Sequence, residues 1–182
     1  THPDKGGHFT RGTSHDEYAR YTEAGAPYVR SMERIAKKFE TARALVPAAE
    51  ITPAAGGDSL QGVIYFGTTS ASVREALGSL HGDGIELDAL RVRAFPFGDE
   101  VREFIEKHRT VFVVELNRDG QMRTMLINDL EIDPAKLVPV LHYDGLPITS
   151  SFIHETVAGH LAPGARAGRG RTPLRAGSET SE

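Results

Sequence analysis

The chain has 182 residues, with 39% hydrophobic and 25% charged residues, which is ordinary for a soluble globular protein of one domain plus appendages. It contains no cysteine, which excludes disulfides, cysteine nucleophiles and thiolate-held iron–sulfur clusters within this chain and fits a reducing, cytoplasmic location. The net charge of −4 combines an acidic region, residues 47–160, with a basic segment at residues 29–46. The acidic region argues against nucleic acid as a partner, and no apolar run approaches the length of a membrane span.

The first 28 residues are rich in glycine and poor in aliphatic side chains, so we expect an arm or linker without a core of its own. The arm contains a dense group of chemically active side chains, among them His15, Asp16 and Glu17. Neighbouring side chains in an extended segment point in opposite directions, so a metal site or an acid–base pair here would need partners from elsewhere in the fold. The residues alone leave a structural and a functional role open.

Residues 29–46 are predicted to form an amphipathic helix, which Pro27 opens, where its missing N–H costs nothing, and which Pro47 ends. Arginine and lysine occupy much of the polar side, and the apolar side needs a surface to pack against. The apolar positions follow a spacing of three and four residues: Val29, Met32, Ile35, Phe39, Ala42 and Val46. Residues 47–59 are rich in Pro, Ala and Gly and predict a linker to a compact domain at residues 60–160.

Strand and helix signals alternate through the compact domain. Four such pairs predict an α/β domain of three layers, with a mostly parallel open sheet and right-handed crossovers. The expected strands are residues 62–66, 87–95, 110–117 and 137–141, and the expected helices are residues 71–80, a segment from Asp99, residues 121–126, and a segment from Thr149 or Ser150 to Val157. Residues 161–182 are rich in Gly, Arg and Ser and predict a disordered tail.

The strand at residues 110–117 organises this domain. Its run of four apolar residues, Val111 to Val114, lacks polar alternation, which is typical of a central strand covered on both faces. Glu115 and Asn117 stand at its carboxyl end, where open α/β sheets place ligands. Two interpretations are equally supported: a ligand or interface contact, or hydrogen bonds to backbone groups of the following turn.

Two further constellations have weaker support. Residues 67–70 (GTTS) lie between a strand and a helix, where an anion could bind, but they match neither nucleotide-binding glycine pattern, which favours a plain turn with a capping hydroxyl. Ser70, His154 and Asp144 could form a hydrolase triad. However, Ser70 lacks the flanking glycines of a nucleophile elbow, which argues against this reading.

Several motifs together resemble one family, over about residues 7–157. They are the arm at residues 7–23 (GHFTRGTSHDEYARYTE), the helix segment at residues 34–42 (RIAKKFETA), and the segments 93–97 (RAFPF) and 114–122 (VELNRDGQM). In this combination the chain is similar to the alpha subunit of 2-oxoacid:ferredoxin oxidoreductases, most closely the 2-oxoglutarate type. Leu116 departs from the pattern, in which a polar residue stands between the Glu and the Asn.

The resemblance implies a transketolase C-terminal-like domain, preceded by the arm and the helix. It also implies a fragment that lacks the N-terminal domain of the alpha subunit, in keeping with a chain that begins at Thr1. The whole enzyme would decarboxylate a 2-oxoacid on thiamine diphosphate with Mg²⁺, pass electrons through iron–sulfur clusters to ferredoxin and transfer the acyl group to coenzyme A. The fragment alone is expected to bind none of these cofactors and to be inactive, and its expected partners are the beta subunit and the N-terminal part of the alpha subunit.

Carried over to this sequence, the resemblance singles out Arg11, His15, Asp16 and Glu17 as residues near the substrate or a subunit contact. It also turns the strand-end residues, Glu115 and Asn117, into candidates for an interface contact. No catalytic residue and no metal ligand is assigned. Two alternatives stay open: a non-catalytic module for subunit assembly, and, with less support, a free-standing nucleotide-binding domain that uses residues 67–70.

Overall fold

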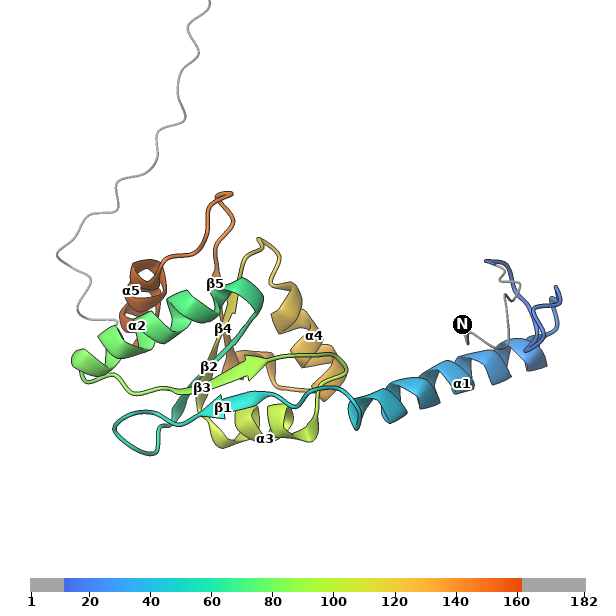
Figure 1. Cartoon of the computed structure of the whole chain (residues 1–182), viewed down its shortest axis with the longest axis horizontal. Helices are drawn as coiled ribbons and strands as arrows, with labels where there is room; N and C mark the ends of the chain where they lie inside the picture. The colour runs from blue at the N-terminus through green and yellow to red at the C-terminus, as the bar shows by residue number, and fades with distance from the viewer. Residues whose placement is uncertain (1–11, 162–182) are drawn as a thin grey trace, which may run out of the picture.

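The computed structural model describes residues 12–161, which form a three-layer α/β domain and one long helix, α1 (Gly25–Arg43), that projects from it (Figure 1). The five strands are ordered β1-β3-β2-β4-β5, and all neighbours pair in parallel except β1 with β3. This confirms the expected fold class. After α1 come β1 (Glu50–Thr52), β2 (Gln61–Phe66), α2 (Ser70–Gly82), β3 (Asp88–Val92), α3 (Asp99–Lys107), β4 (Thr110–Glu115), α4 (Gln121–Leu130), β5 (Leu137–Leu141) and α5 (Ser150–Leu161).

Strand β4 lies inside the sheet, between β2 and β5. Its four apolar residues are 0% exposed, and they alternate between the two faces. Val111 and Val113 face the side covered by α3 and α4, whereas Phe112 and Val114 face the side covered by α2 and α5. The expectation of a central strand covered on both faces is therefore confirmed, although the strand ends at Glu115 rather than at residue 117.

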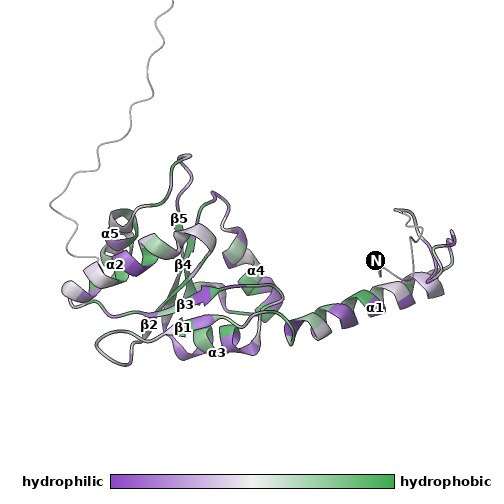
Figure 2. Ribbon diagram, viewed as in Figure 1, coloured by the Kyte–Doolittle hydropathy of each residue, from purple (hydrophilic) through white to green (hydrophobic). Residues whose placement is uncertain are grey.

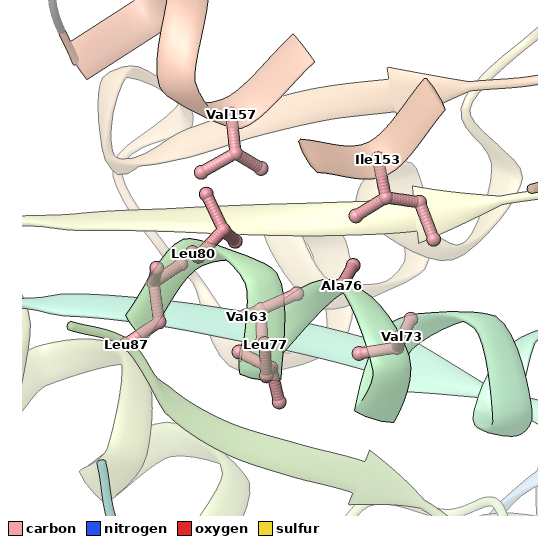
Figure 3. A pocket seen from close by; sticks show the side chains of 8 residues that line it. All are labelled: Val63, Val73, Ala76, Leu77, Leu80, Leu87, Ile153 and Val157. Carbon is pink, nitrogen blue, oxygen red and sulfur yellow. The ribbon is translucent and has the colours of Figure 1, made fainter. Parts of the chain in front are cut away.

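Two apolar layers hold the helices on the sheet. Figure 3 shows the layer in which α2 and α5 meet β2, where residues such as Leu80, Ile153 and Val63 pack without room for a water molecule. The opposite layer contains Phe104 and Ile105 of α3 and Leu126 of α4. Burying each such aliphatic or aromatic side chain contributes about 1.5–3 kcal/mol, so these two layers carry the stability of the domain.

Strand β1 lies in the segment for which the sequence predicts only a linker. It pairs antiparallel with β3 at the edge of the sheet, and its three side chains are exposed. Because no buried face shapes its sequence, hydrophobic periodicity does not reveal it. Polar contacts hold this segment instead: Glu50 pairs with Arg91 at 3.2 Å, and the N–H of Ala49 donates to Glu100 at 2.8 Å.

Some boundaries differ from those expected. β3 ends at Val92 instead of residue 95, because its pairing with β1 and β2 stops there and the chain turns to bury Phe97 in the α3–α4 layer. α4 continues to Leu130 instead of ending at residue 126, and it stops where Glu131 adopts the left-handed conformation at φ 51°. The backbone N–H of Glu131 donates to the carbonyl of Ile127, as in a left-handed helix cap.

Helix α1 begins and ends earlier than the expected 29–46 and buries none of its residues. It ends at Arg43, where the N–H groups of Leu45 and Val46 both turn back to the carbonyl of Ala42, so the following proline does not terminate it. Figure 2 shows hydrophobic positions along this projecting helix. Within residues 12–161, no helix is long and apolar enough to cross a membrane. The tail predicted for residues 161–182 falls, beyond Leu161, outside the described residues.

Candidate functional sites

Glu115 ends β4 with a carboxylate that is 0% exposed. One oxygen accepts hydrogen bonds from the Met122 N–H at 2.7 Å and from the Asn117 amide at 2.7 Å, and the other accepts from the Arg123 N–H at 2.9 Å. Met122 and Arg123 lie in the first turn of α4, whose amide groups have no partner within the helix. The carboxylate therefore caps α4, where the helix dipole favours a negative charge.

Asn117 organises the turn between β4 and α4. Its side-chain oxygen accepts from the N–H of Asp119 at 3.1 Å and from the N–H of Gln121 at 3.3 Å, and Gly120 supplies the left-handed conformation at φ 62° that leads into the helix. Of the two interpretations from the sequence, this geometry favours hydrogen bonding to the backbone of the next turn. A partner contact through Glu115 or Asn117 stays a prediction, and only the half-buried Asn117 is open to direct contact.

His142 follows β5 at the same edge of the sheet, and its N–H donates to the carbonyl of Glu115 at 3.0 Å. Its side chain is 13% exposed, with Nε2 2.9 Å from Asp144 and the ring packed against Phe152 at 5.0 Å between centroids. Sequence reasoning missed this histidine, because nothing in its local pattern separates it from the end of an ordinary strand. Despite this distance, the buried Nε2 makes no hydrogen bond within residues 12–161, so the two groups are neighbours in the β5–α5 loop.

The hydrolase triad is not assembled. His154 contacts Asp83 at 2.7 Å, beyond the C-terminal end of α2, whereas Ser70 begins that helix. Asp144 lies 2.9 Å from His142 instead. The three side chains therefore make separate contacts, which agrees with the argument from the sequence against a triad.

The turn at residues 67–70 is a short 3₁₀ segment that leads into α2, with Gly67 at φ 59°. The Thr69 hydroxyl donates back to the carbonyl of Phe66 at 2.7 Å, and the Ser70 hydroxyl accepts from Arg74 at 3.1 Å. No side-chain hydroxyl caps the N-terminus of α2, so the expected capping role is wrong. The two hydroxyls stabilise the turn and are engaged within the fold.

Asp16 shapes a tight loop in the arm. One carboxylate oxygen accepts from the N–H groups of Tyr18 and Arg20, each at 2.9 Å, and the Asp16 N–H donates to the Arg20 carbonyl at 3.0 Å. The hydrogen bond from the Arg20 backbone holds the pKa of Asp16 below its ordinary value of 3.8. Ala19 at the tip adopts φ 62°, a conformation that this closed loop imposes on a residue with a side chain.

The neighbours of Asp16 have different surroundings. His15 points one ring nitrogen at the Asp16 carbonyl at 2.8 Å, and Glu17 lies 3.4 Å from Arg30, so it links the loop to α1. Arg11 lies outside the described residues. The structure thus brings His15, Asp16 and Glu17 into one loop, but their side chains make separate contacts and do not converge on one point.

A buried charged network lies at the opposite, amino edge of the sheet and was missed by sequence reasoning. Asp88, 3% exposed, accepts from Lys107 at 2.8 Å and from the Ala54 N–H at 2.9 Å, and lies 3.0 Å from His108 Nε2. The other ring nitrogen of His108 lies 2.5 Å from the Phe104 carbonyl. Burial, the largest influence, would raise the pKa of Asp88, but the hydrogen bonds from Lys107, Ala54 and His108 together outweigh it and lower that pKa. The network joins β3, α3 and the segment after β1.

An apolar strip runs along α1. It consists of Val29, Met32, Ile35 and Phe39, which are 52%, 48%, 41% and 48% exposed. At the foot of the helix the Phe39 ring meets Phe95 edge-on, with centroids 6.1 Å apart, beside an open groove of about 270 Å³ against α4. Arg43 donates to the carbonyl of Phe97 and anchors the foot to the domain.

The metal-ligating side chains of the described residues do not fit the metal-bound cofactors of the expected enzyme. Within residues 12–161, no group of three or more His, Asp or Glu side chains gathers in a way that could hold a metal ion. The whole sequence has no cysteine to ligate an iron–sulfur cluster.

Comparisons with known proteins identify two informative relatives, while no family model matches the chain. The chain is 26% identical over 162 residues to the 2-oxoacid:ferredoxin oxidoreductase subunit alpha of Saccharolobus solfataricus, covering 87% of this chain and 25% of that protein. Its fold is similar to that of the 2-oxoglutarate:ferredoxin oxidoreductase from Magnetococcus marinus, solved with 2-oxoglutarate, coenzyme A and succinyl-CoA bound. That match has a TM-score of 0.72 and 22% identity, and covers 87% of this chain and 27% of the other.

The similarity to 2-oxoacid:ferredoxin oxidoreductases expected from the motifs is thus confirmed over most of the chain, at the levels of sequence and fold. The chain spans about a quarter of the length of either relative.

Proposed function

We propose that this chain is part of the alpha subunit of a thiamine-diphosphate-dependent 2-oxoglutarate:ferredoxin oxidoreductase. The observation that carries the proposal is the extent of the similarity, which covers 87% of the chain, although the α/β domain itself begins only after α1. An ordinary α/β domain would match many unrelated proteins through its sheet alone. A match that also takes in much of the region before the sheet supports a common assembly.

The proposed reaction converts a 2-oxoacid, coenzyme A and two oxidised ferredoxins into acyl-CoA, CO₂, two reduced ferredoxins and a proton. Thiamine diphosphate, bound elsewhere in the assembly, would supply the carbanion chemistry that releases CO₂. The described residues would contribute structure and positioning: the sheet supports the loops at its carboxyl edge, and Asp16 fixes the conformation of the arm. The chain alone is proposed to be inactive, because residues 12–161 gather no metal-binding group and the sequence has no cysteine for a cluster.

Reconstitution tests this proposal directly. The full-length alpha subunit that contains this chain is combined with its beta subunit and supplied with 2-oxoglutarate, coenzyme A and an oxidised viologen dye. We expect coenzyme A-dependent dye reduction with 2-oxoglutarate and none with the 182-residue chain alone. Absence of dye reduction with 2-oxoglutarate, pyruvate and branched 2-oxoacids in an assembled complex would reject the proposed activity.

The arm is proposed to lie close to the substrate or to a subunit contact, and Asp16 is the residue to test. Asp16→Asn keeps the shape of the side chain but removes the charge that accepts the Tyr18 and Arg20 amides. In the reconstituted enzyme we expect lower turnover with intact assembly, measured by dye reduction and size-exclusion chromatography. Unchanged kinetics would return the arm to a purely structural role.

A pure assembly module is the second candidate, and the exposed strip of α1 is the observation that favours it. Its four apolar side chains stand at helical spacing and are each between 41% and 52% exposed, a pattern that a partner surface would bury. Ile35→Ser in full-length alpha should reduce co-purification with the beta subunit or loosen contacts within alpha. The matched control is Arg34→Ser, which introduces the same residue one position away on the polar side. Equal co-purification of both variants would contradict a docking role.

The free-standing nucleotide-binding alternative has the least support. The hydroxyls of residues 69 and 70 are engaged inside the turn, and within residues 12–161 Arg74 is the side-chain cation that contacts Ser70. Titration of the chain with adenine nucleotides is expected to produce no change in melting temperature. A concentration-dependent rise would revive this alternative.

A further inference from the structure

A half-enclosed groove of about 250 Å³ lies between α2 and the segment that follows β1. Its apolar surface comes from Pro53, Leu77, Ile85 and Leu87, and Arg74 and His81 stand along α2 at its rim. Arg74 and His81 are seven residues apart, about 10 Å along a helix. The volume falls just below the range of pockets for drug-sized ligands, so the groove suits a smaller molecule.

The wall opposite α2 is held in place by backbone hydrogen bonds. The N–H of Ala54 donates to Asp88 at 2.9 Å, and the N–H of Gly56 donates to Glu86 at 3.1 Å. The Ser59 hydroxyl donates to the Glu86 carbonyl at 2.7 Å. Because this segment is tied to Asp88 at the start of β3 and to Glu86 just before it, the groove is formed in advance, and binding would not have to order a loop.

Gly78 lines the groove in the middle of α2, where glycine destabilises a helix relative to alanine. Packing does not require it, since an added Cβ would meet no atom within 4 Å, and its φ is not in the left-handed region. A longer side chain at this position would extend into the open space of the groove. Glycine at position 78 therefore keeps the groove open.

The charges around the groove favour an anion at one end only. Arg74 donates to the neutral Ser70 hydroxyl at 3.1 Å and makes no ion pair within residues 12–161. At the other end the Nδ1 of His81 lies 2.5 Å from the Glu86 carboxylate. A second anionic group on a ligand would meet the Glu86 carboxylate, so the electrostatics disfavour dicarboxylates.

We infer that this groove binds a small monocarboxylate, with the apolar body of the ligand against Leu77, Ile85 and Leu87 and its carboxylate on the guanidinium of Arg74. This site is separate from the strand-end residues and from the arm. Its ligand also differs in charge from 2-oxoglutarate, so the inference does not depend on the proposed reaction.

The test is a titration of the ¹⁵N-labelled 182-residue chain with three six-carbon probes: hexanoate, hexan-1-ol and adipate. Hexanoate should shift the amide signals of Ala55, Leu77 and Gly78. The alcohol lacks the charge and adipate adds a second one, so both should bind roughly tenfold more weakly than hexanoate. Equal binding of hexanoate and hexan-1-ol, or no shifts at the groove, would overturn the inference.

Two matched variant pairs make the result specific. Arg74→Gln should remove the preference for hexanoate over hexan-1-ol, whereas Arg102→Gln on α3, beyond the sheet, should leave it unchanged. Gly78→Leu should abolish binding of both probes, whereas Gly82→Leu should retain it, since Gly82 also meets open space but does not line the groove. Circular dichroism should show that both leucine variants are folded. Loss of binding in both, or in neither, would contradict the assignment.

Discussion

Helix α1 and strand β4 use similar apolar residues in opposite ways. Phe39 on α1 is 48% exposed and meets Phe95 across its edge, whereas Phe112 on β4 is 0% exposed among the α2 and α5 side chains. The same side chain therefore stabilises the domain in one region and, in the other, leaves apolar surface in contact with water. The comparison therefore separates apolar residues that form the core from apolar residues that residues 12–161 leave exposed.

The largest expected effect follows from that pair. Phe112→Ala should lower the free energy of unfolding of the chain by about 3–5 kcal/mol, because the cavity lies in a close-packed layer. Phe39→Ala should lower it by less than about 1 kcal/mol, because the site is already exposed. Urea denaturation followed by circular dichroism measures both. If both variants lowered the free energy of unfolding by a similar amount, α1 would have to pack on the domain in solution, which would contradict this contrast.

Glu115 offers the next test, because it separates a structural carboxylate from an interface residue. Glu115→Gln places an amide next to the N–H groups of Met122 and Arg123 and should cost about 2 kcal/mol of unfolding free energy. The control Glu103→Gln, on the exposed side of α3, should stay within about 0.5 kcal/mol of the parent. A neutral result at Glu115 would leave the interface interpretation as the better one.

A pH effect is expected from the buried network at the other edge of the sheet. The pKa of Asp88 is lowered in the folded chain, so its contribution to stability is complete above the ordinary value of 3.8 and is lost as the pH falls below it through the folded pKa. Asp88→Asn should flatten the decline of the unfolding free energy between pH 4 and pH 2. Asp58→Asn should not, because the Asp58 side chain is fully exposed and 3.8 Å from Lys107. Parallel pH profiles for Asp88→Asn and the parent chain would contradict this assignment.

The smallest effect concerns the arm. Asp16→Ala should speed hydrogen exchange at the amides of Tyr18 and Arg20 severalfold, since both lose their acceptor, while the unfolding free energy of the domain stays unchanged. Glu17→Gln should leave both exchange rates as they are, because Glu17 contacts Arg30 instead. A drop in global stability on changing Asp16 would show that the arm is coupled to the domain.

Elements with a periodic apolar pattern were predictable from the sequence, and strand β1, which has no such pattern, was not. The apolar run of β4 and the three-four spacing in α2 reflect two-sided or one-sided burial, and the structure confirms both. β1 has three exposed residues and is held by pairing with β3, so its sequence carries no periodic signal. The boundaries of α4 and β3 depend on a left-handed residue and on where neighbouring strands stop, neither of which is a local pattern.

The candidate sites divide in the same way. Asp16 acts on residues two and four positions away, and Glu115 acts on the turn that follows its strand, so local reasoning could identify both as chemically active positions. Sequence reasoning missed Asp88, His108 and Arg74, whose roles come from neighbours on other elements or from a groove. No spacing rule joins Asp88 to an amide 34 positions earlier and to a histidine 20 positions later.

The sequence by itself determined the layered α/β domain, the amphipathic helix and the similarity to 2-oxoacid:ferredoxin oxidoreductases, because hydrophobic periodicity and motif order are properties of neighbouring residues. Only the tertiary structure decided that Glu115 caps α4, that the α1 strip stays uncovered by residues 12–161, and that a groove opens beside Gly78. Those features depend on which groups folding brings within a few ångströms of each other. Hydrogen bonds and close packing act only over that range.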